Sequence, residues 1–106
     1  MPEAIALERE LKAVMKSGKV VLGAKESLQL LLRNELKGLV IADNTPYEVR
    51  ERLTYVARLN NVPVAIFKGT SAELGSVIGK PFKVSAIGII DPGDSKIIDL
   101  LLDEQR

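Results

Sequence analysis

The sequence contains no cysteine and no histidine among its 106 residues. The absence of cysteine excludes disulfide bonds, thiolate metal sites and a cysteine nucleophile. The absence of histidine removes the side chain that most often serves as general base or metal ligand, so Ser-His-Asp, Cys-His and histidine-rich metal chemistry are excluded too. The composition therefore argues against an enzyme and in favour of a binding module.

Aromatic residues are also scarce, at 4% with no tryptophan, so we expect an aliphatic core. Hydrophobic residues make up 46% of the chain and charged residues 27%, which is ordinary for a globular protein. A chain of this length supports one core, and we expect residues 1–106 to form a single domain. No apolar run approaches the roughly 20 residues that span a bilayer, and the first ten residues lack the apolar segment of a secretion signal. The sequence predicts a cytoplasmic protein without membrane contact.

Charge is nearly balanced in total but not along the chain. The formal net charge is only +1, yet the segment 11–25 contains no acid and four lysines: Lys12, Lys16, Lys19 and Lys25. The segment 84–106, in contrast, holds five acids against two basic residues. Because polyanion binding depends on local charge, a basic binding face is possible, while an ordinary mixed surface explains the pattern equally well.

Apolar residues at helical spacing alternate with short apolar runs along the chain. The helical patterns cover residues 4–15, 28–34, 46–60 and 71–78, and the strand-like runs cover 19–22, 39–42, 62–67 and 84–90. This alternation predicts an α/β fold, a three-layer α/β/α sandwich around a four-stranded sheet that we expect to be mixed. Residues 97–102 fit either a last half-turn of helix or an extension of a strand.

Two helix starts carry capping signals. In the first, Thr45 is the expected N-cap, Pro46 takes the first helical position and Glu48 completes a capping box. In the second, Thr70 is the expected cap and Glu73, three residues on, is its partner.

Two strand–helix connections carry groups suited to a polyanion. In the first, at 23–27, glycine permits close approach, backbone N–H groups at a helix start attract phosphate, and Lys25 adds charge. A plain strand–helix turn explains this segment as well. In the second, at 43–46, Asn44 is not needed for capping, and its amide offers both a donor and an acceptor to base edges.

A third loop places Phe82 between Lys80 and Lys83. An aromatic ring flanked by cations suits base stacking beside phosphate neutralisation. The alternative is that Phe82 anchors the loop on the core. If this loop reaches the end of the sheet where the first two connections lie, the three segments form one basic, amide-bearing patch.

Two other sequence features do not indicate nucleotide binding or catalysis. The segment 75–80 superficially resembles a nucleotide phosphate loop, but it has one residue too few between its glycines and a helix before it rather than after. Pro81 also stands where a magnesium-binding hydroxyl is required. The carboxylates of Glu48, Glu51 and Glu73 fall at cap and surface positions, so paired acid–base catalysis is not indicated.

Four stretches and one turn carry a family resemblance: 19–28, 41–46, 69–75, 79–84 and the turn 91–95. In order and spacing they resemble the large-subunit ribosomal protein thirty-e family, a group of kink-turn RNA-binding proteins of archaea and eukaryotes. The match covers nearly the whole chain, and the absence of extensions favours an archaeal member. The resemblance implies an α/β/α sandwich that binds RNA and catalyses nothing.

The resemblance also implies an RNA-binding surface. Gly23 and Lys25 would approach the phosphate backbone. Asn44 would contact the purine-rich kinked internal loop, and Phe82 would pack on an extruded or terminal base. The other residues implied at or near this surface are Ala24, Ser27, Thr45, Pro46, Arg50, Lys83 and Val84. No catalytic residue, metal site or cofactor is implied.

We therefore expect a structural constituent of the large ribosomal subunit in the cytoplasm. Its expected partners are ribosomal RNA with a kink-turn-like internal loop and neighbouring ribosomal proteins, and we expect a monomer when it is free. Two alternatives stay open. One is a kink-turn-binding protein of guide-RNA modification particles, and the other is an α/β domain that binds a small molecule in an apolar pocket.

Overall fold

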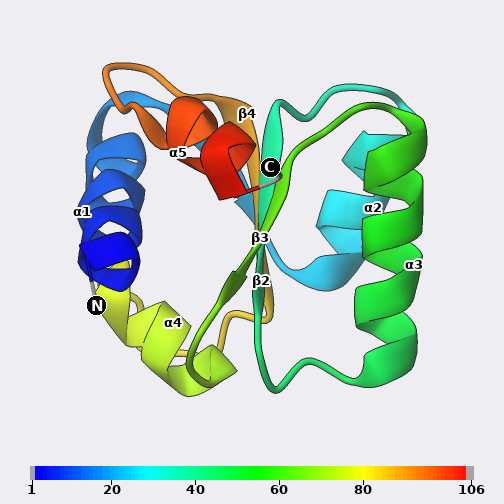
Figure 1. Cartoon of the computed structure of the whole chain (residues 1–106). Coiled ribbons are helices and arrows are strands. Elements are labelled where there is room, and N and C mark those ends of the chain that lie inside the picture. The colour runs from blue at the N-terminus through cyan, green and yellow to red at the C-terminus, as the bar shows by residue number, and fades with distance from the viewer. Residues whose placement is uncertain (1, 105–106) are drawn as a thin grey trace.

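Five helices and four strands alternate along residues 2–104, the part of the chain that the computed structural model describes (Figure 1). In chain order they are α1 (Pro2–Ser17), β1 (Lys19–Leu22), α2 (Ala24–Leu32), β2 (Gly38–Ala42), α3 (Tyr47–Leu59), β3 (Val64–Phe67), α4 (Ser71–Val77), β4 (Ala86–Asp91) and α5 (Ile97–Glu104). Within the described residues, none of the helices combines the length and the hydropathy of a membrane span. The predicted α/β fold is confirmed.

The strands form one mixed sheet in the order β1-β4-β2-β3. β2 and β3 are parallel, whereas β4 runs antiparallel to both β1 and β2. The start of β4 therefore lies beside the ends of β1 and β2. We call this part of the molecule, where β1, β2 and β3 end and β4 begins, the carboxyl end of the sheet.

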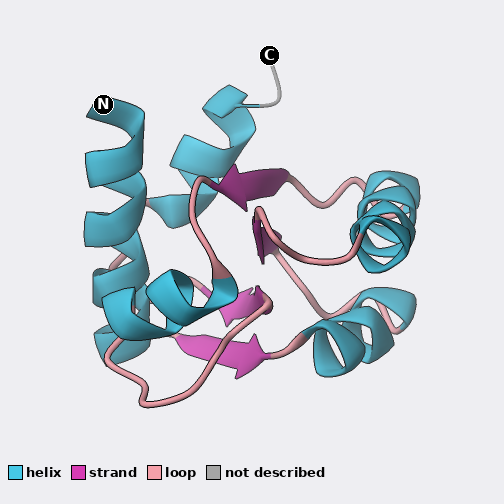
Figure 2. Ribbon diagram, turned by 90° about the horizontal axis from the view of Figure 1, so that it is seen from below, coloured by secondary structure: helices cyan, strands magenta, loops and turns pink. Residues whose placement is uncertain are grey.

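Helices cover both faces of this sheet, as Figures 1 and 2 show. α1, α4 and α5 lie over one face, and α2 and α3 pack together over the other. β2 is buried on both sides, because Val40 and Ala42 join the first core while Leu39 and Ile41 join the second. The predicted three-layer sandwich is confirmed, and β2 is its central buried strand.

The capping box predicted for α4 is present. The Glu73 N–H donates to Thr70 Oγ1 at 3.1 Å, and the Thr70 N–H donates to Glu73 Oε1 at 3.0 Å. The backbone N–H of Thr70 holds the pKa of the Glu73 carboxyl below its ordinary value, with the Thr70 side chain adding to the effect. The first turn of α4 is thus fixed by its own sequence.

The capping box predicted for α3 is wrong. Pro46 occupies the N-cap position without a side-chain hydrogen bond, and α3 begins at Tyr47. The Thr45 hydroxyl, which was expected to cap this helix, is buried and donates instead to the Ser85 carbonyl at 3.1 Å. The Thr45 hydroxyl, predicted to cap α3, therefore bonds Ser85 just before β4 instead.

Two strands begin later than the sequence pattern predicts. Strand β3 starts at Val64 because the Val62 N–H still bonds the carbonyl of Ala57 in α3. Strand β4 starts at Ala86 because the Val84 N–H bonds the carbonyl of Ser71 rather than a neighbouring strand.

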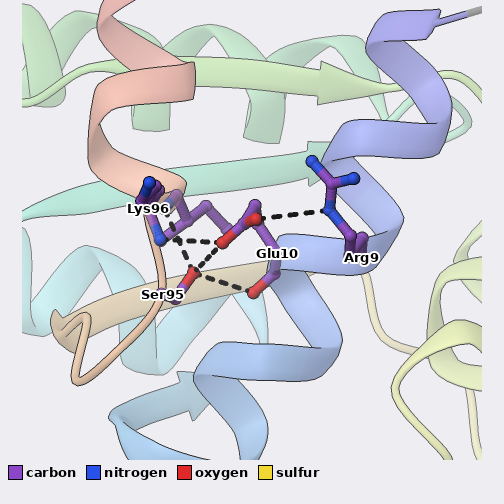
Figure 3. Close-up of polar contacts among 5 residues, drawn as sticks. Arg9, Glu10, Ser95 and Lys96 are labelled. Carbon is purple, nitrogen blue, oxygen red and sulfur yellow. Dashed lines mark hydrogen bonds and ion pairs between the residues drawn. The ribbon is translucent and has the colours of Figure 1, made fainter.

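Residues 97–102 form neither the half-turn nor the strand extension considered from the sequence, but belong to the two-turn helix α5. Glu10 of α1 secures its start: the Lys96 N–H donates to Glu10 Oε1 at 2.7 Å, and the Ser95 hydroxyl lies 2.9 Å from the same oxygen (Figure 3). On the other side of the carboxylate, Arg9 Nε lies 3.5 Å from Glu10 Oε2. Ile97 then buries its side chain in the core.

Candidate nucleic-acid interface

The start of β4 joins the two strand–helix connections singled out in the sequence. The Gly23 N–H donates to the Ala86 carbonyl at 2.8 Å, and the Ala42 N–H donates to the Ser85 carbonyl at 2.9 Å. The Thr45 hydroxyl donates to that same Ser85 carbonyl. Because the loop 79–85 leads directly into β4, all three segments meet at the carboxyl end of the sheet. The condition set from the sequence, that the Phe82 loop reaches the end of the sheet where the first two connections lie, is therefore met.

In the first segment, Gly23 is the N-cap of α2 and has a backbone conformation that favours glycine. Gly23 has φ 109°, and a Cβ there would lie 2.6 Å from Glu26 Oε2. Lys25 is exposed and has no ion pair within the described residues, so its charge is available to a ligand. Ala24 is half-buried, whereas Ser27 is fully buried and its hydroxyl has no hydrogen-bond partner there.

Asn44 is exposed on the second segment, but only one of its two polar groups is unengaged. Its Oδ1 accepts a hydrogen bond of 2.8 Å from the N–H of Ser71, the first residue of α4. Its amide nitrogen has no partner among the described residues. The expected donor of Asn44 is therefore unengaged, while the expected acceptor already takes one hydrogen bond from α4.

Arg50 lies one turn into α3 and turns back toward the same segment. Its Nη1 is 3.5 Å from both the carboxylate and the carbonyl oxygen of Asp43. The half-buried guanidinium thus supports the loop that carries Asn44, and Asp43 offsets part of its charge. Pro46 is exposed between them.

Phe82 does not anchor its loop on the core, since its side chain is 54% exposed. Its neighbour Lys83 is exposed as well, so an aromatic face and a cation stand side by side at the surface. Val84 behaves differently: it is 2% exposed, and its N–H donates to the Ser71 carbonyl at 3.0 Å. Val84 holds the loop in place and presents no side chain outward.

The residues implied at the interface therefore fall into two sets. Those with accessible side chains or backbone at the carboxyl end of the sheet are Gly23, Ala24, Lys25, Asn44, Pro46, Arg50, Phe82 and Lys83. Those with buried side chains, which act by packing, are Ser27, Thr45 and Val84.

Two features of the site were missed from the sequence. Ser71 contacts both the Asn44 and the Phe82 segments, and the parallel pairing of β2 with β3 is the signal that could have placed it there. An open groove of about 450 Å³ also runs between α2 and α3, and it adds the exposed Arg52 beside Lys25. Within residues 2–104, no cluster of three acidic side chains could hold a metal ion.

The sequence of the chain is similar to a family of known proteins. The profile described as the Ribosomal protein L7Ae/L30e/S12e/Gadd45 family matches residues 5–99, which include all three segments. The large ribosomal subunit protein eL30 of Sulfolobus acidocaldarius is 38% identical over 101 residues, covering 95% of this chain and 97% of that protein. The protein of the same name from Methanothermobacter thermautotrophicus is 42% identical over 95 residues, covering 90% and 97%. That from Saccharolobus solfataricus is 37% identical over 99 residues, covering 93% and 92%.

Proposed function

The chain belongs to the ribosomal protein L7Ae/L30e/S12e/Gadd45 family, and we propose that it is a non-catalytic constituent of the large ribosomal subunit that binds a kink-turn-like loop of ribosomal RNA. The archaeal proteins that this chain matches over nearly their whole length are named as large ribosomal subunit proteins. Those names favour the ribosome over a guide-RNA modification particle.

The observation that carries the proposal is the meeting of three different chemical groups at the carboxyl end of the sheet. Lys25 supplies a cation without an ion pair among the described residues, Asn44 an outward amide donor and Phe82 an exposed aromatic residue. Phosphate, base edge and unstacked base are the ligands that these three groups respectively suit. Each comes from a separate segment, Lys25 from the first turn of α2 and the other two from loops, and the start of β4 holds the segments together.

The same groups favour a kinked RNA over a regular duplex. The deep major groove of A-form RNA keeps side chains away from its base edges, and its bases are stacked, so neither Asn44 nor Phe82 would find a partner there. A kinked internal loop exposes purine edges and extrudes a base. The groove between α2 and α3 is open to solvent rather than enclosed, which disfavours the small-molecule alternative.

Filter binding with a kink-turn RNA tests the proposal, with the same RNA carrying swapped purine pairs as the control. We expect the kink-turn to bind about 5- to 150-fold more tightly, which corresponds to about 1–3 kcal/mol of discrimination. We also expect a shallow salt dependence, since each neutralised phosphate adds about −0.9 to the log–log slope and few cations are concentrated here. Equal affinity for the two RNAs would contradict the proposal.

A further inference from the structure

The backbone of one residue, Ser71, is hydrogen-bonded to both recognition loops. Its N–H donates to Asn44 Oδ1 at 2.8 Å, and its carbonyl accepts from the Val84 N–H at 3.0 Å. Asn44 belongs to the loop after β2, and Val84 ends the loop that carries Phe82. Ser71 therefore links the residue suited to a base edge with the loop suited to base stacking.

The bond from Ser71 determines how the Asn44 amide is turned. A backbone N–H can only donate, so the amide oxygen must face Ser71 and the NH₂ group must face away. Without this contact, the amide could present either its donor or its acceptor to a ligand.

We propose that Ser71 is a positioning residue that fixes Asn44 as a hydrogen-bond donor, so that the interface selects a base presenting acceptor atoms. Guanine, with O6 and N7, is such a base, whereas the N4 amino group of cytosine is a donor for which the outward NH₂ group of Asn44 offers no acceptor. The inference rests on the proposed RNA-binding function and specifies which base edge the site takes.

The surroundings of Ser71 are rigid enough for this role. The reciprocal capping bonds between Thr70 and Glu73 fix the turn immediately around it. The Asp43 N–H lies 3.0 Å from the Phe67 carbonyl and 3.1 Å from the Gly69 carbonyl, so the loop after β2 is tied to the loop after β3. Asn44 and Ser71 are thus held in register before any RNA arrives, and binding need not order the amide.

Ser71→Pro removes the N–H with little other change. Ser71 is the first residue of α4, the position where proline is best tolerated in a helix. The residue before a proline must be extended, and Thr70 already has φ −79° and ψ 167°. Ser71→Ala also lacks the hydroxyl but keeps the N–H, so it is the matched reference for Ser71→Pro.

The experiment measures the ratio of affinities for kink-turn RNA and for the RNA with swapped purine pairs. We expect this ratio to be about two- to twelvefold lower in Ser71→Pro than in Ser71→Ala, the effect of immobilising one side chain. In an Asn44→Ala background, the same exchange at Ser71 should change nothing, because no amide remains to be positioned. A general destabilisation of α4 would act in both backgrounds.

Asn44→Asp provides a second test that does not depend on the fold of the proline variant. Its carboxylate can still accept from the Ser71 N–H but has no donor to offer. We therefore expect it to lose as much selectivity as Asn44→Ala. Wild-type selectivity in Asn44→Asp, or equal ratios in Ser71→Pro and Ser71→Ala, would overturn the inference and leave the proposed function standing. If the wild-type protein does not prefer the kink-turn at all, the proposed function fails first and the inference fails with it.

Discussion

Gly75 of α4 packs directly against the backbone of Phe82. A Cβ at residue 75 would come within 2.1 Å of the Phe82 carbonyl oxygen and 3.3 Å of its carbonyl carbon. Real Cβ atoms do not approach backbone oxygen so closely, so the loop that presents the exposed ring can lie on α4 only because residue 75 has no side chain.

Gly75→Ala is therefore expected to displace the Phe82 loop and to weaken RNA binding. Alanine in place of a mid-helix glycine would by itself stabilise the helix by about 1 kcal/mol. The clash opposes this gain and should leave a net loss, since overpacking typically costs about 1–3 kcal/mol. Urea unfolding and RNA titration of the same preparation measure both effects. A more stable protein with wild-type affinity would show that the loop adapts without consequence.

Phe82→Ala should weaken RNA binding and leave the fold nearly unchanged. The ring is 54% exposed, so little packing is lost, while losing a base–aromatic stack costs about 1–3 kcal/mol of binding. Phe67, the other phenylalanine, is the matched control: it is 7% exposed, and Phe67→Ala should cost about 3–5 kcal/mol of stability. A large fall in melting temperature for Phe82→Ala with unchanged affinity per folded molecule would mean that the ring is structural.

Ser27→Ala should stabilise the protein without affecting RNA binding. The Ser27 hydroxyl is fully buried and has no partner among the described residues, and a buried unpaired polar group costs about 1–3 kcal/mol. Removing it should raise the free energy of unfolding by up to that amount. Weaker RNA binding by this variant would show instead that the RNA reaches the Ser27 hydroxyl.

Glu10 should make the fold sensitive to acid. The Lys96 N–H, followed by the Ser95 hydroxyl and Arg9, holds the pKa of Glu10 below its ordinary value of 4.5, although burial opposes the shift. A lowered pKa in the folded state stabilises the protein above the ordinary value, and this stability is lost as the pH falls through the folded-state pKa. Glu10→Gln cannot titrate, so its unfolding free energy should fall less between neutral pH and pH values below 4.5. Parallel pH profiles for the two proteins would contradict this assignment.

Local patterns were sufficient to predict most of the fold. The alternation of helical and strand-like segments, the continuous apolar run of β2 and the Thr70–Glu73 capping box all depend on residues close in sequence. The sequence also predicted that the connections after β1 and β2 share one end of the sheet. It did not place the Phe82 loop there, because that depends on β4 running antiparallel between those two strands.

What the sequence could not show depends on distant partners. The Thr45 hydroxyl bonds a carbonyl 40 residues away, and Asn44 Oδ1 bonds an N–H 27 residues away. The start of α5 depends on Glu10, 86 residues before Lys96. From nearby sequence alone, each of these polar groups would bond a neighbouring residue or have no partner. In the folded protein, each bonds a residue far away in the sequence.

The central claim is that Asn44 and Lys25 contribute separately to RNA binding. Asn44 provides selectivity for the kink-turn, and Lys25 provides affinity for any RNA. Asn44→Ala, Lys25→Ala and wild type are titrated against kink-turn and plain duplex RNA at several salt concentrations. Lys37→Ala is the control, because Lys37 is exposed where β2 begins, at the opposite end of the sheet.

Asn44→Ala should lower the ratio of kink-turn to duplex affinity about 5- to 150-fold, which corresponds to about 1–3 kcal/mol. Lys25→Ala should instead weaken binding to both RNAs alike and flatten the salt slope by about one unit, while Lys37→Ala resembles wild type. An unchanged affinity ratio for Asn44→Ala would contradict the account, because the loop after β2 would then not read the RNA.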